Sequence, residues 1–106
     1  MLQTLSISGL SALQKHSAEA AELLKQLSNQ NRLMIMCSLI GNELSVGALN
    51  ESTHLSQSAL SQHLALLRNA NLVSTRRDGQ IIFYSLKGDK AIKVIGVLKS
   101  IYCPEI

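Results

Sequence analysis

Apolar residues recur at helical spacing in five stretches of this 106-residue chain, and these stretches predict five helices. Their approximate ranges are 11–27, 29–40, 45–52, 57–69 and 89–102, and Gly9 lies just before the first. Asp78-Gly79 follows the fourth stretch between apolar and β-branched runs, which is a strong signal for a β-hairpin. The pattern predicts a mainly α fold with a small β-hairpin, a winged helix-turn-helix of five helices and a two-stranded wing.

Polar residues at the predicted helix starts support these boundaries. Ser28 or Asn29 can cap the second helix, Ser45 the third and Ser56 the fourth. Gly41 is typical of the position just past a helix end, so the second helix is expected to stop there.

The fourth stretch separates into two arcs at about 100° per residue. The apolar arc contains Ala59, Leu60, His63, Leu64, Leu66 and Leu67. The opposite arc contains Gln57, Ser58, Ser61, Gln62, Ala65, Arg68 and Asn69. Amides, hydroxyls and one arginine without any acid can bind base edges and phosphates, whereas a solvated face usually mixes Glu and Lys. We therefore interpret this stretch as a DNA recognition helix.

Arg76 and Arg77 adjoin the predicted hairpin tip. They could be solvated turn residues, but behind a recognition helix they are expected to meet backbone phosphates or the minor groove. The predicted DNA-binding residues are Ser56, Gln57, Ser58, Ser61, Gln62, Arg68, Arg76 and Arg77. His63 is predicted to be a packed, hydrogen-bonded core histidine, and His16 and His54 to be surface residues.

Composition bounds the remaining possibilities. The net charge of +3 permits nucleic-acid binding. No apolar run reaches the roughly 18 residues of a membrane span, and the N-terminus lacks the basic region of a secretory signal, so a cytoplasmic protein is expected. Cys37 has no nearby motif histidine and no Gly-rich phosphate loop is present, which argues against an enzyme. A winged helix that binds a protein in place of DNA should show an acidic or apolar recognition face. The face predicted here is polar and contains no acid, which argues against that function.

From about Leu23 to Cys103 the chain resembles the ArsR family of winged-helix repressors. The run SQSALSQHLALLRNANLVSTRRDGQIIFYSL carries the resemblance, and ELSVGAL and LKSIYCPE with Cys37 point to the HlyU-, BigR- and SqrR-like dithiol subgroup. The chain length predicts one domain over residues 1–106. The resemblance implies a homodimer packed through its first and last helices, and a palindromic double-stranded DNA operator. It also implies no cofactor, and reactive sulfur or an oxidant as inducer.

Metal sensing is the main alternative within the family. Many relatives place a cysteine pair where this chain has Ser45 and Gly47, and others use Asp and His on the last helix. Here the last helix has Asp89 near its start and no histidine. Serine and glycine supply no thiolate, so no metal site is expected.

Cys37 and Cys103 are the candidate redox pair. As alternatives, Cys37 is a small buried hydrophobic residue and Cys103 is a thiol in the C-terminal tail. The family fold implies that the second and last helices lie side by side, and Cys103 near the chain end could travel to resolve an adduct on Cys37. The chain is therefore expected to be a DNA-binding regulator, most simply a repressor, whose operator affinity falls on dithiol oxidation. An anti-silencing activator without a thiol switch is the other alternative.

Overall fold

The computed structural model describes residues 7–105. The prediction that the N-terminus is not a secretory signal falls largely on residues outside this range. Six helices and three strands follow one another along the described chain. In order they are α1 Ile7–Lys15, α2 Ser17–Leu27, α3 Gln30–Ser38, β1 Leu44–Ser45, α4 Val46–Thr53, α5 Gln57–Asn69, β2 Val73–Asp78, β3 Ile81–Leu86 and α6 Lys90–Tyr102.

The mainly helical winged helix-turn-helix is confirmed, but the count of five helices is wrong. The first predicted helix is broken at His16, and Gly9 lies inside α1 and not before it. Ser17 Oγ donates to the Gln14 carbonyl at 3.0 Å, and the His16 amide bonds three residues back to Leu13. A serine hydroxyl that competes for backbone acceptors offers the chain an alternative to the regular helix, and the chain bends there.

The prediction of a two-stranded wing is also incomplete, because a third strand, β1, pairs with the hairpin. The sheet order is β1-β3-β2, with Leu44 opposite Tyr84 and Ser45 opposite Phe83. Two residues are too few to show the alternation that identifies a strand in sequence. The hairpin turn is centred on Gly79 and Gln80, one residue later than the Asp78-Gly79 signal, and Gly79 has φ +64°.

The predicted starts of α3, α4 and α5 are confirmed by their capping bonds, whereas the first helix begins at Ile7 and not near Ser11. Asn29, and not Ser28, accepts from two backbone amides at the start of α3. Ser45 Oγ accepts from the Ala48 amide and begins α4. The last turn of the second predicted helix is not helical, because α3 ends at Ser38 and not at Gly41.

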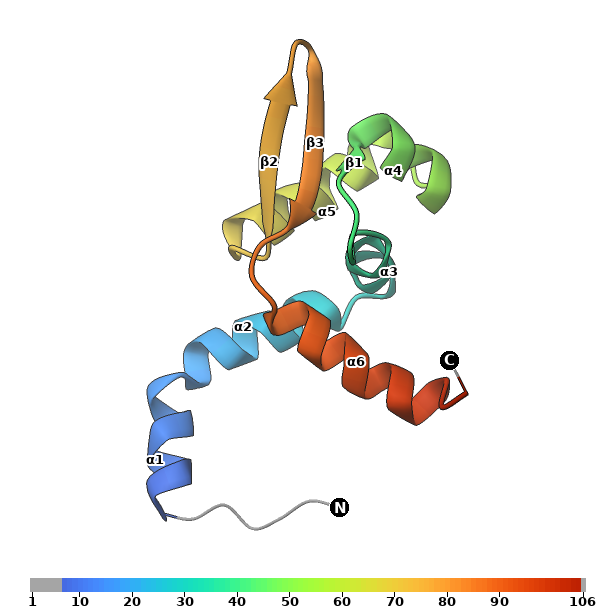
Figure 1. Cartoon of the computed structure of the whole chain (residues 1–106). Coiled ribbons are helices and arrows are strands. Elements are labelled where there is room, and N and C mark those ends of the chain that lie inside the picture. The colour runs from blue at the N-terminus through green and yellow to red at the C-terminus, as the bar shows by residue number, and fades with distance from the viewer. Residues whose placement is uncertain (1–6, 106) are drawn as a thin grey trace.

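One apolar core joins α3, α4, α5 and the base of α6. Its fully buried members include Ile35, Met36, Leu49, Leu60 and Leu67, and Ile95 of α6 packs with them. Figure 1 shows the wing projecting from one end of the molecule, with α1, α2 and α6 at the other end. The core therefore connects α5 and the base of the wing to α6, while the tip of the wing lies at the opposite end of the molecule from the terminal helices.

Candidate nucleic-acid interface

The turn before α5 presents the start of that helix to solvent. α4 ends at Thr53, and its C-cap His54 is exposed as predicted and takes a left-handed conformation with φ +58°. Ser56 then caps α5 by accepting from the Ala59 amide at 3.1 Å. This αL turn redirects the chain within three residues, so α4 and α5 form a helix-turn-helix pair.

The polar arc of α5 is exposed along its whole length. Its members are Gln57, Ser58, Ser61, Gln62, Ala65, Arg68 and Asn69. Leu60, Leu64 and Leu67 of the opposite arc are buried, but Leu66, which was expected there, is 45% exposed. Within the described chain, the amides of Gln57 and Gln62 make no side-chain hydrogen bond, so their donors and acceptors stay available.

His63 lies at the inner border of this helix. It is half-buried, and its Nδ1 atom lies 3.4 Å from the Arg32 guanidinium. Burial, and then the charge of Arg32, lower the pKa of His63 below its ordinary value. The packed, hydrogen-bonded histidine predicted from the sequence is therefore confirmed, although it lies at the edge of the core.

The two wing arginines have different surroundings. Arg76 forms a bidentate ion pair with Glu43, with Nη2 to Oε1 at 2.7 Å, and its guanidinium lies 4.6 Å from the Phe83 ring centroid. This contact lowers the pKa of Glu43 and raises that of Arg76. Arg77 is exposed and makes no ion pair among residues 7–105. Sequence reasoning missed Glu43, since nothing local links it to a residue 33 positions later.

The structure places the two cysteines on elements that pack together, α3 and the end of α6. Both are free thiols; Cys37 is half-buried and Cys103 is exposed. Burial raises the pKa of Cys37, and the Lys99 ammonium on α6 partly opposes that effect. The Cys103 amide donates to the Lys99 carbonyl at 2.7 Å. Cys103 therefore lies one helical turn beyond Lys99, the residue whose charge acts on Cys37.

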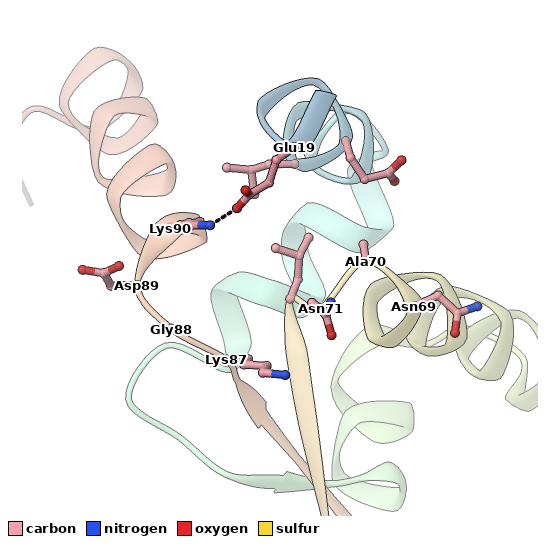
Figure 2. Close-up of a pocket in the computed structure, with 11 residues that line it drawn as sticks. Glu19, Asn69, Ala70, Asn71, Lys87, Gly88, Asp89 and Lys90 are labelled. Atoms are coloured by element: carbon pink, nitrogen blue, oxygen red, sulfur yellow. Dashed lines mark hydrogen bonds and ion pairs between the residues drawn. The ribbon is translucent and has the colours of Figure 1, made fainter. Parts of the chain in front are cut away.

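A cavity of about 600 Å³ lies where α2, the α5–β2 turn and the β3–α6 loop meet (Figure 2). Glu19 of α2 and Lys90 of α6 form an ion pair at its rim, and Asn71 and Lys87 lie on the other side. The ion pair ties the start of α6 to α2, on the opposite side of the core from the wing tip.

The terminal helices carry large apolar side chains that the single chain leaves exposed. They are Leu10 and Leu13 of α1, Leu24 of α2, and Ile92, Val97, Ile101 and Tyr102 of α6. Surfaces of this kind are rarely left to solvent and usually mark an interaction site.

Two further features concern metal binding and membrane insertion. Among residues 7–105, no three His, Cys, Asp or Glu side chains cluster closely enough to hold a metal ion. No helix in that part of the chain is both long and apolar enough to cross a membrane.

Comparison with known proteins identifies the family. The model described as "Bacterial regulatory protein, arsR family" matches residues 29–75, from the cap of α3 into β2. The chain is 49% identical over 94 residues to "Transcriptional activator HlyU" of Vibrio cholerae, covering 89% of this chain and 87% of that protein.

Two solved structures superpose well. Reduced HlyU from Vibrio cholerae has a TM-score of 0.79 at 49% identity, covering 87% of this chain and 97% of the other. The transcriptional repressor BigR from Xylella fastidiosa has a TM-score of 0.82 at 41% identity, covering 88% and 95%. The chain is therefore a member of the ArsR family of DNA-binding transcriptional regulators, and not an enzyme.

Proposed function

We propose that this regulator binds a palindromic operator as a homodimer, with α5 in the major groove and the wing against the phosphate backbone. The exposed, acid-free polar arc of α5 is the observation that carries this proposal. Gln57, Ser58, Ser61 and Gln62 supply amides and hydroxyls for base edges, and Ser56, Arg68 and Arg77 supply groups for phosphates.

The exposed apolar side chains of α1, α2 and α6 support a homodimer built on the terminal helices. A second copy of the chain brings an identical apolar face and covers them in a symmetric interface. The Glu19–Lys90 ion pair links α2 to α6, so the apolar side chains of both helices can belong to one dimer surface. Two recognition helices then read half-sites about 34–36 Å apart on the DNA.

The inducer in this proposal is a reactive sulfur species or an oxidant, and the sensor is Cys37 with Cys103. The exposed Cys103 thiolate attacks a persulfide RS–SH, takes its outer sulfur and releases RS⁻. The Cys37 thiolate then attacks the Cys103 sulfur, a disulfide forms, and hydrosulfide leaves. We assign the first attack to Cys103 and the resolving step to Cys37, the reverse of the order expected from the sequence, because Cys103 is exposed whereas Cys37 is half-buried and its pKa is raised by burial.

The disulfide would join α3, which packs on α5, to the end of α6, which carries the proposed dimer face. Small shifts of α6 then change the distance between the two recognition helices, and both half-sites lose contacts. A relative solved in a form described as reduced is consistent with redox chemistry in this part of the family.

We propose repression as the direct effect, because a dimer on a palindrome excludes other proteins from that DNA. The relatives include a named activator and a named repressor. Run-off transcription from purified operator DNA tests the sign. Lower transcript with reduced protein supports repression, and an increase seen only with a silencing protein present would instead support anti-silencing.

A further inference from the structure

A long-range ion pair links the wing to the segment before α4. Arg76 lies on β2 and Glu43 directly precedes β1, so the pair connects the two outer strands of the sheet. Arg76 Nε donates to both Glu43 carboxylate oxygens at 3.2 and 3.1 Å, and Nη2 adds a third bond at 2.7 Å. A bidentate contact fixes direction as well as distance.

Phe83 of the central strand completes the contact. It is paired with Ser45 on one side and with Arg76 on the other, and its ring lies under the guanidinium at 4.6 Å. Arg76 therefore crosses the face of β3 to reach Glu43. The three side chains connect every strand of the sheet, and β1 runs directly into α4.

We infer that Arg76 is a positioning residue, which Glu43 and Phe83 hold so that the wing keeps a set angle to the helix-turn-helix. The inference rests on the proposed DNA contacts of the wing. Arg77, on the opposite face of the same strand, is then the arginine that meets phosphate. A carboxylate within 3 Å neutralises the Arg76 charge and repels a phosphate that approaches the same guanidinium.

The rival account is that Glu43 only occupies Arg76 until DNA displaces it. The two accounts predict opposite signs for Glu43→Gln. If Glu43 competes with phosphate, its neutralisation frees Arg76 and tightens binding. If Glu43 positions the wing, the same change weakens binding, although it removes a negative charge from a DNA-binding protein.

The test measures operator affinity of the reduced, full-length protein by fluorescence anisotropy at several salt concentrations. Glu43→Gln and Arg76→Gln should each weaken binding roughly threefold to tenfold, and the double variant no more than either single one. Neither should change the slope of log K against log salt. Arg77→Gln is the matched control and should flatten that slope by about 1.8, the value for two lost phosphate contacts, one from each protomer of the proposed dimer.

Arg76→Lys keeps the charge but loses the bidentate geometry, so it should bind as weakly as Arg76→Gln. Thermal unfolding of each variant checks that the fold is retained. Tighter binding by Glu43→Gln, a flattened slope for Arg76→Gln, or unchanged affinity in both would overturn the inference. Wild-type protein that bound no DNA would instead refute the proposed function.

Discussion

The Arg32 guanidinium lies against Nδ1 of His63 at 3.4 Å and so connects α3 to the recognition helix. The same guanidinium donates to the carbonyls of Lys25 and Gln26 at the end of α2, at 3.3 and 3.1 Å. A guanidinium only donates, so Nδ1 accepts and the ring proton is assigned to Nε2. One side chain therefore connects α2 and α3 to the helix proposed to read DNA.

The burial of His63, together with the charge of Arg32 beside it, predicts a loss of stability in mild acid. The pKa of His63 is lower in the folded protein than in the unfolded chain, where it is near 6.5. Above that pH His63 is neutral in both the folded and the unfolded state, so its protonation does not change the free energy of unfolding. As the pH falls below it, the unfolded chain takes up the proton first, so the free energy of unfolding decreases until the folded pKa is passed. Urea unfolding from pH 7.5 to 5 measures the effect.

His63→Gln should reduce this pH dependence, because glutamine can accept from Arg32 but cannot titrate. Arg32→Met should destabilise the protein by about 1–3 kcal/mol, since two helix-end carbonyls lose a charged donor. Equal pH profiles for wild type and His63→Gln would refute the assignment.

Base recognition should depend on the polar arc of α5. Gln57→Ala or Ser61→Ala should weaken operator binding by about 1–3 kcal/mol and relax base preference, because each removes a group that is proposed to contact a base edge. Gln30→Ala, an exposed glutamine at the start of α3, should have no effect. Competition with single-base operator variants measures both quantities. Intact affinity after removal of the whole arc would show that the recognition face is elsewhere.

The terminal helices should hold a dimer. Ile101 is 60% exposed on α6, and Ile101→Glu should give monomers with much weaker operator binding, because a charge cannot be buried in the apolar interface. Ile81 is 53% exposed at the wing tip, and Ile81→Glu should leave the oligomeric state unchanged. Light scattering at micromolar concentration tests both. A wild-type monomer that bound a palindrome tightly would contradict the proposal.

The thiol pair should control DNA affinity. Persulfide or peroxide treatment should weaken operator binding by about 1–3 kcal/mol, the usual coupling between linked sites. Cys37→Ser and Cys103→Ser should each bind DNA and lose most of this response. Mass spectrometry of treated wild type should find the two cysteines linked. In early samples Cys103 should carry the first adduct, since it is exposed.

Metal ions should not control the affinity of the protein for its operator. Stoichiometric zinc or cadmium should leave operator affinity nearly unchanged, because Ser45 and Gly47, where the family resemblance implies a cysteine pair in metal-sensing members, provide no thiolate. Titration of the reduced protein on labelled operator tests this. Tight, stoichiometric zinc binding that released the DNA would contradict it.

The sequence alone determined the parts of this protein that depend on neighbouring residues. The polar and apolar arcs of α5, the serine caps at Ser45 and Ser56, and the hairpin near Gly79 were all predictable. Each depends on hydrogen bonds or periodicity within a few positions. Family membership was also predictable, because the motif that indicates it is one continuous run of residues through α5 and the wing.

Only the tertiary structure decided which distant side chains meet. Arg76 and Glu43 are 33 positions apart and Arg32 and His63 are 31 apart, and no local pattern marks either pair. The two-residue strand β1 exists because β3 lies beside it, and the exposure of Leu66 reflects where the core ends. Such contacts follow from packing across the whole core, which brings together groups that the order of residues keeps apart.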